Sequence, residues 1–135
     1  MNLDRFGEFV KNALIKIGCD PTAISELDPH QTIEIALDGM PSMFVGVNEK
    51  NIMIWSNVCE YHESLMRVRA DELLEAVMDG IQFGVNQQLM LRENSGYLQI
   101  WANVSDAYLE NDELMGKALE EFFERHARFT EIVKQ

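Results

Sequence analysis

Apolar residues recur at spacings of three and four in three long segments of the chain, which is the period of an amphipathic helix. The pattern predicts helices over about residues 3–17 and 64–83, and a last helix from residue 111 or 112 to about residue 133. Gly18 suits the left-handed position just past the first helix, and Pro21 prevents its continuation. Asn111 and Asp112 are both good N-caps for the last helix.

Between these helices the apolar positions alternate with polar ones, as in half-buried strands. The first strand alternates at Ile33, Ile35 and Leu37, after a loop over about residues 20–31, and further strands are predicted near 42–47, 52–58, 88–92 and 97–104. Residues 38–41, 48–51 and 93–96 are expected to form the short turns. Short turns make neighbouring strands antiparallel, so the order of helix, three strands, helix, two strands and helix predicts an α+β domain.

The predicted strands carry large apolar residues on both faces, although a half-solvated sheet needs only one apolar face. The residues on the second face are Phe44, Met53, Trp55, Tyr97 and Trp101. Either one of the domain's own helices covers this layer, or part of it faces another chain, because exposed apolar patches mark partner sites.

The first helix raises the same question as the second sheet face. Its apolar stripe is wide, and Phe6, Phe9 and Val10 need not all fit one core. The stripe is therefore either purely core or the edge of a groove for an apolar peptide.

Composition narrows the class of protein. Hydrophobic residues make up 47% and charged residues 25% of the 135 residues, which is typical of one globular domain over residues 1–135. The net charge of −12 disfavours nucleic acid and anionic lipid as partners. We expect no secretory signal and no membrane span, hence a cytosolic protein. On the last helix, Glu121 with Arg125 and Glu124 with Arg128 have the i,i+4 spacing of ion pairs.

The sequence offers little material for catalysis. His30, His62 and His126 have no ligand-spaced partners on their own elements, and Cys59 with His62 supplies only half of a zinc site. The two cysteines, Cys19 and Cys59, are expected to be reduced thiols. No phosphate-binding glycine motif is present in the sequence. We therefore expect no catalytic residue, no metal site and no cofactor.

Several short strings together resemble the class I (IB) type III secretion chaperones, and most closely the InvB/SpaK invasion-chaperone family. The resemblance covers nearly the whole chain, and the order and spacing of the strings carry it. The strings are Gly18-Cys19-Asp20-Pro21, Asp28-Pro29-His30, Met40-Pro41-Ser42, Ile54-Trp55-Ser56-Asn57, Arg69-Ala70-Asp71-Glu72-Leu73-Leu74, Val77-Met78-Asp79-Gly80, and Leu119 with Phe122-Phe123.

The resemblance implies an α-β-β-β-α-β-β-α fold, a homodimer and a role in the bacterial cytoplasm. It implies a chaperone without ATP hydrolysis that binds the N-terminal region of one or several secreted effectors, keeps it extended and soluble, and promotes its delivery to the export apparatus. The secretion ATPase there is a further candidate partner.

Two sets of residues follow as hypotheses from the resemblance and the apolar pattern. The hypothesised effector surface consists of Phe6, Phe9, Val10, Leu14, Phe44, Met53 and Trp55. The hypothesised dimer interface consists of Ala70, Leu73, Val77, Tyr97 and Trp101. Two alternatives stay open: an acidic adaptor or anti-activator that masks a basic partner, and a small enzyme that uses Cys59 or His62.

Overall fold

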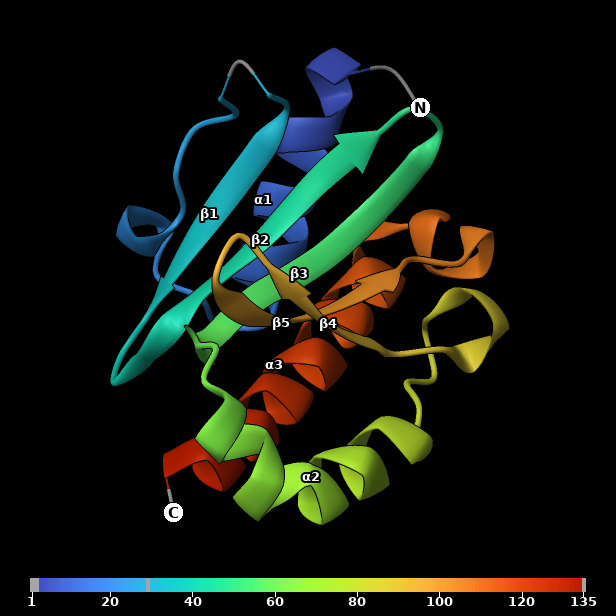
Figure 1. Ribbon diagram of the computed structural model, residues 1–135. Coiled ribbons are helices and arrows are strands. Elements are labelled where there is room, and N and C mark those ends of the chain that lie inside the picture. The colour runs from blue at the N-terminus through green and yellow to red at the C-terminus, as the bar shows by residue number, and fades with distance from the viewer. Residues whose placement is uncertain (1–2, 29, 135) are drawn as a thin grey trace.

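The alternating strands form one antiparallel sheet in the order β1-β2-β3-β5-β4 (Figure 1). The computed structural model describes residues 3–28 and 30–134, so Pro29 of the predicted loop lies outside the described residues. The described elements follow the predicted order of helix, three strands, helix, two strands and helix. Their bounds are α1 Leu3–Lys16, β1 Thr32–Leu37, β2 Met40–Asn48, β3 Asn51–Glu60, α2 Glu63–Met78, β4 Met90–Asn94, β5 Tyr97–Asn103 and α3 Asp112–Lys134.

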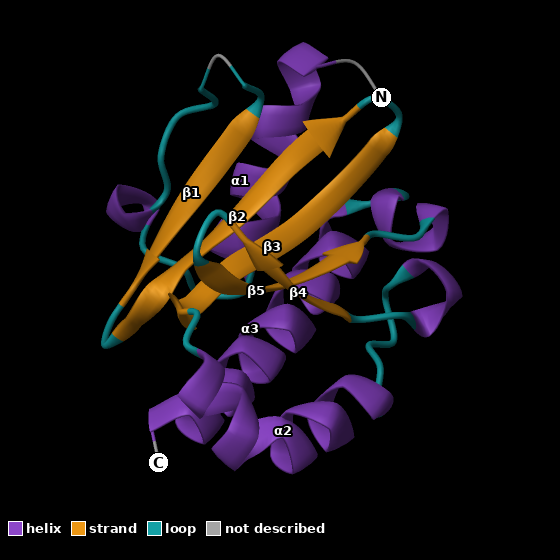
Figure 2. Ribbon diagram, viewed as in Figure 1, coloured by secondary structure: helices purple, strands orange, loops and turns teal. Residues whose placement is uncertain are grey.

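The core lies between one face of the sheet, called the inner face here, and the helices α1 and α3. Both helices lie behind β1–β3 in Figure 2, and no helix stands in front of these strands. The strands β1, β2, β3 and β5 send alternate side chains into the core, such as Ile33, Val45, Ile54 and Ile100, all at most 1% exposed. Burying side chains of this size contributes roughly 1.5–3 kcal/mol each, so this layer dominates the stability of the fold.

The helix α2 ends at Met78, five residues before the predicted end at residue 83. Gly80 has a φ of +65°, and a Cβ atom there would lie 2.6 Å from the carbonyl oxygen of Gln87. This position therefore requires glycine and breaks the helix. Ile81 and Phe83 fit the helical period in the sequence, but they are buried in the loop that follows.

The hairpin between β1 and β2 is tighter than predicted, because β2 already begins at Met40. Leu37 pairs with Met40 and Ile35 pairs with Met43, so Pro41 and Ser42 lie opposite a single residue of β1. This is a β-bulge, where a proline without an N–H group is tolerated.

The bulge is attached to the core through His126 of α3. Its Nε2 atom lies 2.7 Å from the carbonyl oxygen of Pro41, which can only accept, so Nε2 carries the proton. The ring is 0% exposed and Nδ1 has no partner among the described residues. Burial lowers the pKa of His126, while the hydrogen bond to Pro41 raises it by less. The ring is therefore held neutral.

Because the folded state keeps His126 neutral, the free energy of unfolding should fall as the pH drops below about 6.5, the ordinary pKa of histidine. Below that pH the unfolded chain binds a proton that the folded chain excludes. We expect His126→Gln, which can still donate to Pro41, to flatten this dependence between pH 7.5 and 5.5 in urea unfolding. The exposed His62→Gln variant should keep the wild-type slope, and equal slopes in His126→Gln and wild type would contradict this account.

Candidate functional site

The face of the sheet turned away from α1 and α3, called the outer face here, carries a row of aromatic side chains. Phe44 pairs with Trp55 across β2 and β3, and Trp55 pairs with Trp101 across β3 and β5. The rings of Phe44 and Trp55 are stacked, with centroids 5.5 Å apart and planes 15° apart. These side chains and Met53 are half-buried, and Tyr97 is exposed. The predicted second apolar layer is therefore present and faces away from the core.

Gly46 makes room for the Trp55 ring. A Cβ atom at Gly46 would lie 2.9 Å from two ring carbons of Trp55, closer than real Cβ contacts allow. The indole therefore lies flat on the strand beside Phe44. A flat aromatic surface of this kind is typical of protein-binding sites, because it offers a large contact area at low cost in side-chain entropy.

Hydrogen bonds connect three polar side chains on the part of the outer face formed by β3, β5 and β4. The Nε atom of Arg92 donates to Gln99 at 2.7 Å, and Gln99 donates to Asn57 at 3.1 Å. The guanidinium of Arg92 also stacks 3.7 Å from the centre of the Trp101 ring. The guanidinium of Arg92 thus covers one face of the Trp101 ring, whose buried indole N–H has no partner among the described residues.

A second apolar surface follows α2. Ala70, Leu74 and Met78 are spaced by four residues and form one exposed line, the α2 stripe; Leu74 is 60% and Met78 is 73% exposed. Leu73 and Ala76 occupy the opposite side of the helix and are buried. The helix therefore has two apolar sides, of which its own chain covers only one.

The hypothesised dimer residues differ in their exposure to solvent. Ala70 and Tyr97 are exposed, and Val77 and Trp101 are half-buried. Leu73 is 1% exposed and belongs to the core, so its inclusion is corrected. The neighbouring Leu74 is exposed instead, and the helical period alone did not show which of the two leucines is buried.

Several residues of the hypothesised effector surface are buried in the structure. Phe6, Val10 and Leu14 are 1%, 0% and 2% exposed and hold α1 in the core, which corrects their assignment to an accessible surface. Phe9 is half-buried and lines a shallow depression on α1. Of these four hypothesised residues on the first helix, Phe9 is the one that is not fully buried.

A groove of about 500 Å³ opens where the end of α1, the β1–β2 hairpin and α3 meet. It is called the α3 groove here. Its apolar lining includes Leu14, Ile17, Ile35, Leu37, Leu119 and Phe123, and Cys19 also reaches it. The two carboxylates that line it, Glu120 and Glu124, project from α3. The apolar stripe of α1 was predicted as a possible groove edge, but the other walls were not foreseen, because they come from segments far apart in the chain.

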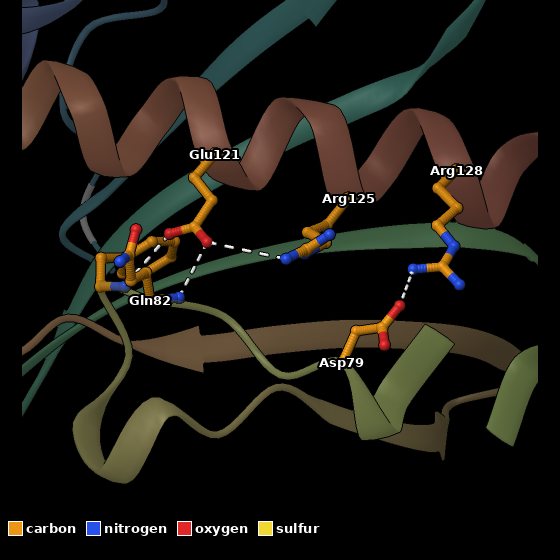
Figure 3. A network of polar contacts seen from close by, with 6 residues as sticks. Asp79, Gln82, Glu121, Arg125 and Arg128 are labelled. Carbon is orange, nitrogen blue, oxygen red and sulfur yellow. Dashed lines mark hydrogen bonds and ion pairs between the residues drawn. The ribbon is translucent and has the colours of Figure 1, made fainter. Parts of the chain in front are cut away.

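Ion pairs and hydrogen bonds join the other side of α3 to the loop after α2 (Figure 3). The carboxylate of Glu121 accepts the backbone N–H of Gln82 at 2.8 Å and that of Phe83 at 3.1 Å, and it lies 3.8 Å from Arg125. The predicted Glu121–Arg125 pair is therefore confirmed.

The predicted pair of Glu124 with Arg128 does not form. Arg128 instead binds Asp79, the C-cap residue that directly follows α2 (Figure 3). The hydrogen bond and charge of Arg128 hold the pKa of Asp79 below its usual range. As a result, Glu124 has no ion-pair partner among the described residues.

Cys59 and His62, the residues considered for catalysis, line the same depression but do not form a hydrogen-bonded pair among the described residues. His62 lies 3.7 Å from Glu60, and no hydrogen bond joins it to Cys59 among the described residues. Burial and the nearby charge of Glu60 raise the pKa of Cys59, so its thiol stays protonated at neutral pH. The described ranges contain no group of three or more His, Cys, Asp or Glu residues arranged to hold a metal ion.

Within residues 3–28 and 30–134, no helix combines the length and the apolar character that crossing a membrane requires.

The fold is shared with chains of several solved complexes. It matches the crystal structure of the ExsC-ExsE complex with a TM-score of 0.67 and 12% identity, over 97% of this chain and 95% of the other. The HopA1-SchA chaperone-effector complex gives 0.58 and 14% identity, over 97% and 98% of the two chains. The Yersinia pestis type III secretion chaperone SycH, in complex with a fragment of YscM2, gives 0.58 and 7%, over 91% and 98%. The fold is thus that of type III secretion chaperones.

Sequence similarity identifies the family more narrowly. The sequence model of the Invasion protein B family matches residues 18–95. The "Surface presentation of antigens protein SpaK" of Salmonella typhimurium (strain LT2) is 34% identical over 116 residues, which are 86% of each chain. The chain therefore belongs to the Invasion protein B family, and the resemblance seen in its sequence is confirmed.

Replacing Glu121 with alanine should lower the free energy of unfolding by about 1–2 kcal/mol, because two backbone N–H groups lose a charged acceptor. Glu131→Ala, at an exposed position of the same helix, should change it by less than about 0.5 kcal/mol. Urea unfolding measures both values, and amide exchange should speed up at Gln82 and Phe83 only in Glu121→Ala. Equal stability of the two variants would show that these hydrogen bonds contribute nothing.

Proposed function

We propose that this protein is a bacterial cytoplasmic chaperone that binds the N-terminal region of type III secreted effectors. It keeps that region extended and soluble and promotes its delivery to the export apparatus. Membership of the Invasion protein B family and the fold shared with secretion chaperones support this function. The observation that carries it is the half-buried aromatic row on the outer face, which no helix of the described residues covers.

The outer face is suited to side-chain capture. An extended client has to bury its apolar side chains, or it collapses or aggregates. Phe44, Trp55 and Met53 offer an apolar surface, and methionine adapts to clients of different shape. Capture through an added strand at β1 is less accessible, because Ser25 already exchanges hydrogen bonds with Glu34, through its backbone N–H and its hydroxyl, both at 2.8 Å.

The proposed chaperone acts by binding and not by catalysis, without cofactor, nucleic acid or membrane partner. Its partners are one or several effector segments, with the secretion ATPase as a further one. We also propose a homodimer in which α2 and β5 of two copies pair, through Ala70, Leu74, Met78, Tyr97 and Trp101. Pairing would remove the α2 stripe from water and double the surface available to one client.

Capture of an effector tests the function. A tagged N-terminal segment of an effector encoded near this protein should bind the wild-type chain in a pull-down and in calorimetry. Phe9→Asp should weaken the affinity by about tenfold or more, because it puts a charge where an apolar contact is lost. Asn48→Asp, at the exposed end of β2, makes the same change of charge and should bind as the wild type does. Circular dichroism should be unchanged in both.

The salt dependence of the same binding separates the two functions left open by the sequence. Apolar capture should weaken little as salt rises, whereas an acidic adaptor that masks a basic partner would lose it steeply. Capture of no effector segment, or a steep salt dependence with full binding by Phe9→Asp, would refute the proposed chaperone.

The dimer is tested separately, by sedimentation velocity. Leu74→Asp should shift the chain towards monomer, since it places a carboxylate in the α2 stripe. Val68→Asp is the matched control, because Val68 is 69% exposed on another side of the same helix. A wild-type monomer at micromolar concentrations, or equal dissociation of the two variants, would refute the proposed interface.

A further inference from the structure

We propose that the α3 groove selects client segments in which a bulky apolar side chain lies within four positions of a lysine or arginine. This inference rests on the chaperone function proposed above and adds the chemical class of the client. Two features of the groove carry it: an apolar floor of the size of a ligand site, and carboxylates that no cation of the described chain neutralises.

The floor is built to receive apolar groups. The groove has a volume of about 500 Å³, within the range of roughly 300–1,000 Å³ that is usual for sites enclosing a ligand. Leu119 and Met43 are at most 2% exposed, whereas Phe123, on the same helix as Leu119, is 42% exposed. An apolar side chain seated here would cover the Phe123 ring and remove both surfaces from water.

The charge of the lining points to a basic neighbour for that side chain. Glu120 and Glu124 are one helical turn apart on α3, and both are exposed. Like charges at this spacing repel, and no ion pair neutralises either one among the described residues. The nearby arginines are engaged elsewhere, Arg125 with Glu121 and Arg128 with Asp79.

The same charges decide which occupant fits. The lining of the groove includes no lysine, arginine or histidine, so an acidic ligand would meet uncompensated repulsion. A second copy of this chain carries a net charge of −12 and meets the same repulsion. A segment with an apolar anchor and a cation within four positions of it fits both the apolar floor and the carboxylates of the groove.

The chain contains its own reporter for occupancy of the groove. Cys19 lines the α3 groove, while Cys59 lies in a separate depression at the end of β3. The two thiols are similar: both are half-buried, and burial followed by an adjacent carboxylate raises the pKa of each. A ligand in the groove should therefore protect Cys19 from iodoacetamide and leave Cys59 reactive.

The probe is a phage-displayed library of random twelve-residue peptides, selected on the full chain. Enriched peptides should combine a bulky apolar residue with a lysine or arginine within four positions, and should slow alkylation of Cys19 only. Glu120→Gln/Glu124→Gln should bind them about fivefold more weakly at low salt, as expected for two partly exposed ion pairs. Glu113→Gln/Glu131→Gln removes the same charge elsewhere on α3 and should bind normally.

Each other outcome overturns the inference. These outcomes are no enriched peptide, enrichment without basic residues, equal binding by the two double variants, or protection of Cys59 in place of Cys19. Protection of Cys19 that rises with chaperone concentration in the absence of peptide would assign the groove to a second copy. If the Glu120→Gln/Glu124→Gln variant captures an effector segment with wild-type affinity, the selectivity fails and the chaperone function stands; if the wild type captures none, both fail.

Discussion

The organisation of this molecule depends on the fact that its helices cover only one of the two apolar faces of the sheet. Its strands carry large apolar side chains on both faces, but α1 and α3 both pack on the inner face. The aromatic row of Phe44, Trp55 and Trp101 is therefore only half-buried by its own neighbours in the sheet. Leaving such area in water costs free energy, which binding of another chain recovers. The layer arrangement thus supports the proposed affinity for unfolded segments.

The helix α2 is placed differently from the other two. It packs mainly against α3, and the loop that follows it is fixed by Glu121 and Arg128 (Figure 3). These polar contacts lie at the end of the helix, so most of its surface is free. The position of the α2 stripe is therefore set by charged contacts far along the sequence, and its composition can change without loss of the core.

The order of the elements could be predicted from the sequence because it depends on local periodicity. The burial of individual apolar residues could not be predicted in this way. Phe6 and Phe9 fit the same helical stripe, yet one is buried and the other is half-buried, because burial depends on neighbours that are distant in the sequence. The end of α2 was also missed, since the requirement for Gly80 comes from the close approach of Gln87.

The candidate site also contains features that could be predicted from the sequence and features that could not. The outer-face residues were recognised because alternation in a strand assigns a face directly. The α3 groove was not, since it forms only where α1, β1 and α3 meet. The sequence also did not reveal that Glu124 lacks an ion-pair partner among the described residues. The arginine four residues further on, Arg128, binds Asp79, which is distant in the sequence.

The segment before β1 has a consequence for the behaviour of the protein at high concentration. Ile24 bridges Ile35, and Asp28 donates to Thr32, so the backbone of β1 is paired on its second side as well. A bare strand at a sheet margin acts as a template for further strands and for fibrils. Residues 24–28 close that margin. At the β1 edge, the sheet of the proposed chaperone is thereby kept from extending into a neighbouring molecule.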